Sequence, residues 1–107
     1  MTAVTDLLTL TDAGLYCPAG GFHIDPVRPV ERAVVTHAHA DHCRPGHRAL
    51  LATPGTAALA AARYGAEAFG EVQTLGYGEE ISVAGVALRL APAGHVLGSA
   101  QVVVEAG

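Results

Sequence analysis

The chain has 107 residues, with ten Asp and Glu against six Arg and no Lys, so its net charge is -4 with His neutral. This length allows one domain, and a composition of 50% hydrophobic and 15% charged residues excludes a disordered chain and a basic nucleic-acid-binding arm. No apolar run approaches the roughly 18 residues of a membrane span and no signal-peptide pattern is present, so we expect a cytoplasmic protein with no membrane partner, whose Cys17 and Cys43 stay free thiols.

Short apolar runs between Gly, Pro and Asp favour a sheet with tight turns over a helical bundle. In the first third of the chain we expect strands over 7–11, 14–17 and 21–24, which form a β-meander that ends at Asp25-Pro26. A further strand over 33–36 leads directly into a segment rich in histidine.

One helix is predicted over residues 54–64, where Thr53 can cap the first turn, Pro54 suits the first position and Gly65 can close the end. After it we expect strands over 71–75, 80–83, 86–90 and 100–105, with Ala84-Gly85 as the hairpin turn between the middle two. The predicted class is therefore α/β (α+β) with mostly strands.

Four of the six histidines lie between residues 37 and 47, and the pattern HxHxDH follows the strand over 33–36. His37 and His39, two apart in an extended segment, project to the same side and can bind one ion. The chain must then turn, so Asp41 and His42 suit a second ion, and Asp41 is also the candidate catalytic residue that accepts a proton from water. Surface histidines or one structural zinc are the alternatives, but structural zinc sites are usually rich in Cys, and the only nearby thiol is Cys43.

A third ligand for the first ion is expected from another loop, and His95 in PAGHVLGS is the candidate because Gly94 and Gly98 permit close approach of the backbone. Two divalent ions about 3.5 to 4 Å apart generate a bridging hydroxide and hold the attacking and leaving oxygens of a displacement at phosphorus. His23 and His47 lack such support, so we interpret His23 as a residue on a strand face and His47 as a residue on the rim of the site.

These motifs resemble those of the metallo-β-lactamase superfamily: THxHxDH at residues 36–42, followed by the Gly-His loop AGHVLGSA at residues 93–100. The form GHVLGSA is similar to that of the nucleic-acid-processing branch. The opening stretch GLYCPAGGFHIDPVRPVERAVVTHAHADHCRPGH resembles the bacterial ligase-associated DNA exonuclease family. The resemblance runs from about residue 7 to residue 105.

The resemblance implies an αββα sandwich of which residues 1–107 form only the amino-terminal half, with an apolar sheet face left uncovered. The resemblance implies that Asp25 is a hydrogen-bond acceptor that supports the histidine loop. It also implies a bridging Asp and two later His residues beyond Gly107. Two zinc ions are implied, the first bound by His37, His39 and His95 and the second by Asp41 and His42.

The function that follows from the resemblance is a metal-dependent phosphodiesterase, a DNA exonuclease that uses a zinc-bridging hydroxide and acts in DNA repair with a DNA ligase as partner. Arg44 and Arg48 flank the histidine motif and are candidate phosphate contacts, with solvated loop charge as the alternative. Three other functions remain open: an RNA-processing nuclease, another hydrolase on the same scaffold, or a catalytically incomplete zinc-binding fragment.

Overall fold

The computed structural model describes residues 8–37, 43–93 and 100–106. Within these ranges the chain forms strands, one α-helix and one short 3-10 helix. The strands are β1 (Thr9–Thr11), β2 (Gly14–Cys17), β3 (Phe22–Ile24), β4 (Arg32–Val34), β5 (Ala49–Ala52), β6 (Glu71–Thr74), β7 (Glu80–Val83), β8 (Val86–Pro92) and β9 (Ala100–Ala106). The helices are α2 (Pro54–Tyr64) and η1 (Ala66–Ala68).

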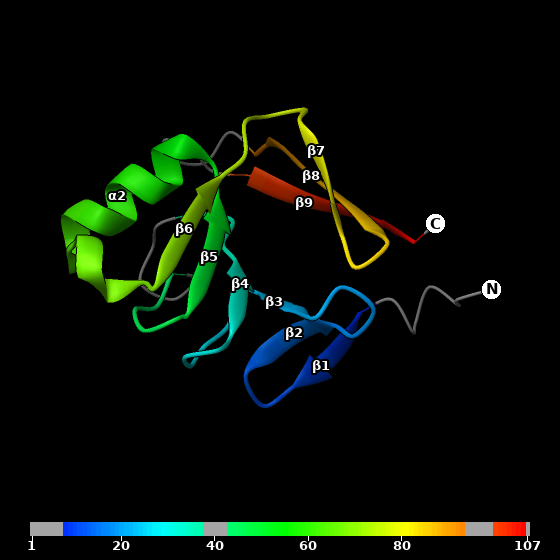
Figure 1. Ribbon diagram of the computed structural model, residues 1–107, viewed down its shortest axis with the longest axis horizontal. Helices are drawn as coiled ribbons and strands as arrows, with labels where there is room; N and C mark the ends of the chain where they lie inside the picture. The colour runs from blue at the N-terminus through cyan, green and yellow to red at the C-terminus, as the bar shows by residue number, and fades with distance from the viewer. Residues whose placement is uncertain (1–7, 38–42, 94–99, 107) are drawn as a thin grey trace.

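The strands form two sheets, one of six strands in the order β1-β2-β3-β4-β5-β6 and one of three in the order β7-β8-β9 (Figure 1). β1, β2 and β3 are antiparallel, whereas β3, β4, β5 and β6 are parallel to one another. Because neighbouring parallel strands end at the same edge of a sheet, the residues that follow β3 and β4 are brought together there.

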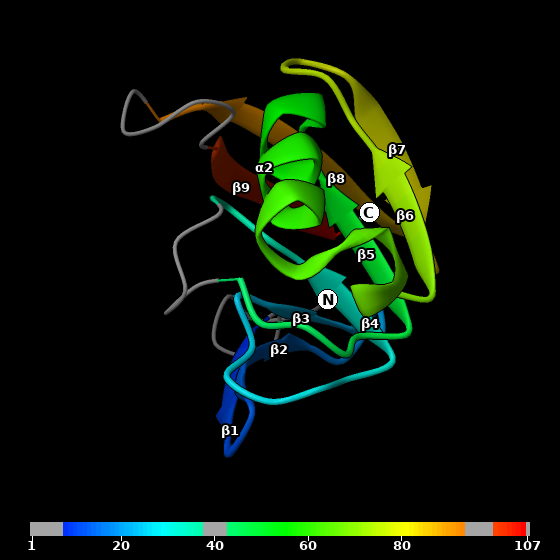
Figure 2. The ribbon, with the colours of Figure 1, turned by 90° about the vertical axis from the view of Figure 1, so that its left-hand side faces the viewer.

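Successive side chains along β4 and β5 point to opposite sides of the six-stranded sheet, and apolar residues lie on both sides. Ala33 and its partner Leu50 pack under α2, together with Ala60 and Phe69 of the helical side. Their neighbours Val34 and Leu51 point the other way, into a core shared with the three-stranded sheet. The result is three layers, helix over sheet over sheet, which can be followed in Figure 1 and in the view onto the helix in Figure 2.

Part of the inner face of the six-stranded sheet is exposed. Leu10 on β1 pairs with Leu15 on β2, and the cross-strand row continues through Ile24 to Val34 and Leu51. Val34 is 3% exposed, whereas Leu15 is 42% and Leu10 80% exposed. Burial of this face therefore decreases from β4 toward β1.

The helix begins and ends where the sequence predicts. The Thr53 side chain accepts from the Thr56 N–H, Pro54 occupies the first turn, and the Gly65 N–H donates to the Ala61 carbonyl. The described helices include none that is long and apolar enough to cross a membrane.

The antiparallel opening meander, the strands over 14–17 and 80–83 and the Ala84-Gly85 turn are confirmed. The strand predicted over 33–36 is shifted to Arg32–Val34, because Thr36 turns away to bond with Asp25. Strand β5 was missed, since Ala and Leu have weak intrinsic preference for strands and only pairing with β4 and β6 places Ala49–Ala52 in the sheet. The mixed α and β class is confirmed, and the complete sandwich stays a prediction.

Candidate metal centre

The candidate centre is built where β3 and β4 end. Ile24 on β3 pairs with Val34 on β4, and the N–H of Asp25 donates to the Val34 carbonyl at 2.9 Å. Asp25 has φ +47°, a left-handed conformation that Asp adopts more readily than most residues. This turn aims the Asp25 carboxylate at Thr36.

Two short hydrogen bonds join Thr36 to that carboxylate. The Thr36 N–H donates to Asp25 Oδ1 at 2.7 Å, and the Thr36 hydroxyl donates to Oδ2 at 2.6 Å. On its other side, Thr36 Oγ1 lies 2.9 Å from His37 Nδ1. A continuous chain of hydrogen bonds therefore runs from Asp25 through Thr36 to His37, which fits the predicted supporting role of Asp25.

These hydrogen bonds determine which nitrogen of the His37 ring carries a proton. A carboxylate only accepts hydrogen bonds, so the hydroxyl of Thr36 uses its single hydrogen to donate to Asp25. Thr36 Oγ1 must then accept from His37, so Nδ1 carries a hydrogen, and in the neutral ring the lone pair lies on Nε2. A neutral imidazole whose other nitrogen donates to a fixed acceptor is the form in which His binds zinc, so the donor set at His37 fits a metal.

The other predicted ligands His39, Asp41, His42 and His95 lie outside the described residues. Among the residues that are described, no group of three or more His, Cys, Asp and Glu side chains is placed to hold a metal ion. The backbone of β9 does reach the centre, because the Ala100 N–H donates to the Thr36 carbonyl at 2.7 Å. His95 precedes Ala100 by only five residues in the chain.

Cys43 lies directly after the histidine motif and is fully buried. Burial raises the pKa of its thiol, the charge of Asp25 raises it further, and Arg63 partly offsets this. The Cys43 carbonyl accepts from the Tyr64 hydroxyl at 2.8 Å, which ties this residue to the end of α2. Cys43 is therefore a protonated core residue, and it and Cys17 are both free thiols as predicted.

The prediction that His47 lies on the rim is wrong, because its side chain is 1% exposed. His47 Nδ1 accepts from the Val30 N–H at 3.2 Å, and the ring stacks on Phe69. Burial and the nearby His23 lower the pKa of His47, so the ring is neutral and fixes the loop before β5. His23 lies on β3 with its ring against Tyr16, as the strand-face interpretation predicts.

The structure separates the two predicted phosphate contacts. Arg44 is exposed and immediately follows Cys43. Arg48 immediately precedes β5, at the amino ends of the parallel strands, and forms an ion pair with Glu31 at 3.7 Å. Because His37 follows the carboxyl end of β4, the fold does not bring Arg48 to His37.

The residues that sequence reasoning missed are Thr36, as the bridge within the hydrogen-bond chain, and Tyr64. Thr36 could have been found from its place directly before HxHxDH, next to the first ligand. Tyr64 offered no such signal, because its contact with Cys43 joins residues 21 apart.

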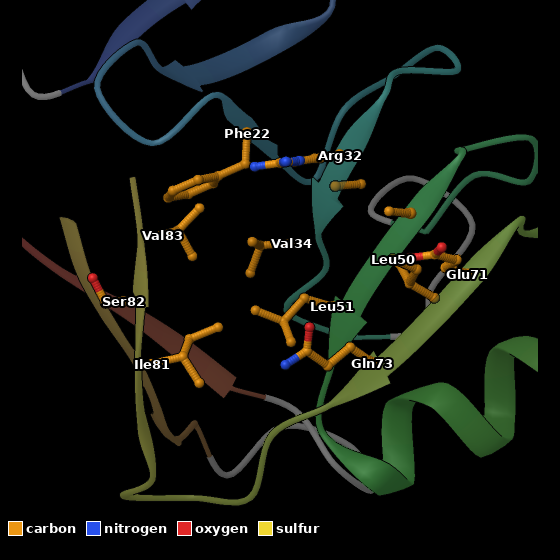
Figure 3. Close-up of a pocket in the computed structure, with 12 residues that line it drawn as sticks. Phe22, Arg32, Val34, Leu50, Leu51, Glu71, Gln73, Ile81, Ser82 and Val83 are labelled. Carbon is orange, nitrogen blue, oxygen red and sulfur yellow. The ribbon is translucent and has the colours of Figure 1, made fainter. Parts of the chain in front are cut away.

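A separate cavity of about 510 Å³ lies between the sheets, along β4 and β5. Figure 3 shows Phe22, Val34, Leu51, Ile81 and Val83 around its apolar interior, with polar side chains at its margin. None of the lining residues belongs to the hydrogen-bond chain at the carboxyl end of β4. The cavity is therefore distinct from the candidate centre.

Comparison with known protein families finds no family model that matches the chain. Among curated proteins, the chain is 42% identical over 94 residues to a "Probable DNA ligase" of Opitutus terrae. The match covers 88% of this chain but only 9% of the length of that relative. The chain is thus similar to a small part of a much longer protein named as a DNA ligase.

Proposed function

We propose that the chain is part of a zinc-dependent phosphodiesterase that cleaves DNA, acting as an exonuclease in repair together with a DNA ligase. The observation that carries the proposal is the hydrogen-bond chain from Asp25 through Thr36 to His37, which presents Nε2 of His37 as a metal donor. The similarity to a protein named as a probable DNA ligase supports DNA as the substrate class.

In this function the residues of the candidate centre have distinct tasks. His37 is a zinc ligand, and Thr36 and Asp25 are positioning residues that fix its ring and its tautomer. His39 and His95 complete the first set of ligands, and Asp41 and His42 belong to the second. When bound, two zinc ions supply hydroxide at neutral pH and stabilise the charge that develops on the phosphate.

The first test is the zinc affinity of the purified chain, measured by competition with a chromophoric chelator. His37→Ala is expected to abolish high-affinity binding. Thr36→Val keeps the shape of the side chain but removes the acceptor for His37 Nδ1, so we expect about ten- to hundred-fold weaker binding. Thr36→Ser restores the hydroxyl and should restore the affinity, and His23→Ala is the matched histidine control.

Equal zinc binding by the unaltered chain and by His37→Ala would contradict the proposal, as would the absence of zinc binding in the unaltered chain. Cleavage is tested with end-labelled DNA and RNA oligonucleotides of the same sequence, with zinc or with EDTA. Zinc-dependent loss of single nucleotides from DNA supports the exonuclease, internal cuts or preference for RNA would correct the substrate or mode, and bound zinc without cleavage would indicate a catalytically incomplete fragment.

A further inference from the structure

Strand β7 lies at one edge of the three-stranded sheet, whose order is β7-β8-β9. It joins β8 through the two-residue hairpin turn Ala84-Gly85, so Val83 and its partner Val86 exchange both of their backbone hydrogen bonds. Bonded and non-bonded pairs alternate along an antiparallel ladder, so Ser82 points its N–H and C=O away from β8. Within the described ranges, no loop or turn forms a hydrogen bond with these two groups.

This free edge of β7 borders the cavity between the two sheets. Ile81 and Val83 point into the cavity and pack against the core, whereas the side chain of Ser82 points away from it (Figure 3). Ser82 still lines the cavity, so it is the backbone of Ser82 that lies along it. The lining includes no described residue of β9, the strand at the opposite edge of this sheet. The free donor and acceptor of Ser82 therefore face the cavity.

Across the cavity lies the inner face of β5 and β6. Leu51 pairs with Gln73 and Ala49 with Glu71, and all four residues line the cavity. Gln73 and Glu71 are exposed, so no described residue covers this part of the face. In packed sheets one strand residue occupies about 160 Å³, given the usual spacing of strands and sheets and the rise per residue. A cavity of about 510 Å³ therefore has room for about three residues of one more strand beside β7.

Strand β7 also lacks the features that usually protect an edge strand from pairing. Its sequence EISV contains no Pro and no Lys, and its register with β8 contains no bulge. Its single charge, Glu80, is exposed and forms no ion pair among the described contacts. Arg89, which lies opposite Glu80 on β8, pairs with Glu105 instead. A basic residue on an incoming strand, placed opposite Glu80, would therefore form a favourable cross-strand pair.

We propose that the free edge of β7 and the adjoining cavity form a docking site for an extended segment of a partner protein, which adds to the sheet as an antiparallel strand. One residue of the segment exchanges two backbone hydrogen bonds with Ser82. Its two neighbours place apolar side chains in the cavity, opposite Ile81 and Val83, and a basic residue follows opposite Glu80. Backbone bonds supply affinity in such strand addition, and the alternate side chains supply specificity. This inference does not depend on the proposed metal centre.

The probe is a capped peptide of sequence SVTVKS, whose Thr pairs with Ser82 and whose Lys then lies opposite Glu80. It is titrated into the isotope-labelled chain in EDTA and followed by NMR. The amide signals of Glu80–Val83 are expected to shift, and the Ser82 amide should become protected from hydrogen exchange. N-methylation of the peptide Thr removes the donor to the Ser82 carbonyl and should weaken binding at least about five-fold. N-methylation of the following Val is the matched control, because that N–H faces away from β7, and it should leave binding unchanged.

Two variants of the chain test the same contacts from the other side. Glu80→Lys should weaken binding of SVTVKS about five-fold, and the peptide SVTVES should bind this variant better than it binds the unaltered chain. Glu67→Lys is the matched control, because Glu67 is an exposed acidic residue of η1 outside the cavity lining. Ser82→Pro removes the free donor but no bond to β8, so it should abolish binding and leave the hairpin paired. Circular dichroism and the urea midpoint establish that each variant is folded.

Equal weakening by the two N-methylated peptides would overturn the proposal, because binding would then not use the free edge of β7. Absence of shifts at Glu80–Val83 with up to about 1 mM SVTVKS would also overturn it. Sedimentation gives a further check on the occupant. If the unaltered chain is a dimer and Ser82→Pro is a monomer, a second copy occupies the edge and the proposal of a partner segment is wrong.

Discussion

Thr36 donates both its backbone N–H and its hydroxyl to the carboxylate of Asp25, at 2.7 and 2.6 Å, although the two residues are 11 apart in the chain. The contact exists because β3 and β4 are parallel neighbours, so the residues that follow them lie at the same edge of the sheet. Hydrogen bonds to a charged acceptor contribute about 1.5 to 3 kcal/mol each. The segment that leads into the histidine motif is thus fixed before any metal binds.

Asp25→Asn is expected to destabilise the fold and to weaken zinc binding. Asn tolerates the left-handed backbone at φ +47°, but its amide group cannot accept both donors of Thr36. We expect a loss of about 2 kcal/mol in the free energy of unfolding, measured by urea titration in EDTA. We expect zinc affinity to fall about ten- to hundred-fold in the chelator assay.

Two further variants separate the effect of the backbone conformation of Asp25 from the effect of its carboxylate on stability. Asp25→Ala should lose about 1 kcal/mol more than Asp25→Asn, because it also adds backbone strain in the left-handed region. Asp12→Asn is the control, since its ion pair with Arg28 is exposed and should change stability by less than about 1 kcal/mol. Unchanged stability and zinc affinity in Asp25→Asn would show that the carboxylate does not support the site.

The burial of His47 predicts that the fold weakens in mild acid. Its pKa is lowered below 6.5 in the folded chain, so below that pH the unfolded chain binds more protons than the folded one. The neutral ring of His47 therefore contributes fully to the free energy of unfolding above pH 6.5. This contribution to stability is lost as the pH falls through the lowered pKa. Protonation also removes the acceptor for the Val30 N–H.

Urea unfolding in EDTA at pH 5, 6, 7 and 8 tests this, with His47→Gln as the variant that cannot titrate. The difference in unfolding free energy between the unaltered chain and His47→Gln should shrink as the pH falls. His23→Gln is the control, and it should also lessen the acid sensitivity slightly because His23 contributes to the shift at His47. A difference that stays constant with pH would refute the prediction.

Thr53→Ala should destabilise the chain by about 1 kcal/mol, because it removes the acceptor for the Thr56 N–H at the start of α2. Thermal unfolding followed by circular dichroism measures the loss. Thr53→Ser keeps the oxygen and should retain most of the stability. If Thr53→Ala and Thr53→Ser were equally unstable, packing of the buried Thr53 methyl group rather than capping would be the cause.

Ala84→Asn should stabilise the chain by about 0.5 kcal/mol. Ala84 and Gly85 have φ +51° and +86°, the left-handed pair of a type I′ hairpin turn, in which Asn-Gly is preferred over Ala-Gly. Urea unfolding measures the gain. Ala84→Val is the opposite control, because a β-branched residue is strained at this φ and should lower stability.

Much of the fold was predictable because its signals lie within a few residues. Thr53, Pro54 and Gly65 define α2 by local capping, and the limits of Gly14–Cys17 and Glu80–Val83 follow from their turns. The HxHxDH motif likewise places four candidate ligands in six residues. Such features need no information about the rest of the chain.

The sequence by itself determined the mixed α and β class, the helix and its caps, the hairpin turns and the candidate ligands. Only the tertiary structure decided that Ala49–Ala52 is a strand, that His47 is buried, that Tyr64 bonds to the Cys43 carbonyl, and that Arg48 does not lie near His37. These outcomes depend on parallel pairing and on packing between segments many residues apart. Such contacts are selected by burial of the whole core, so no short stretch of sequence specifies them.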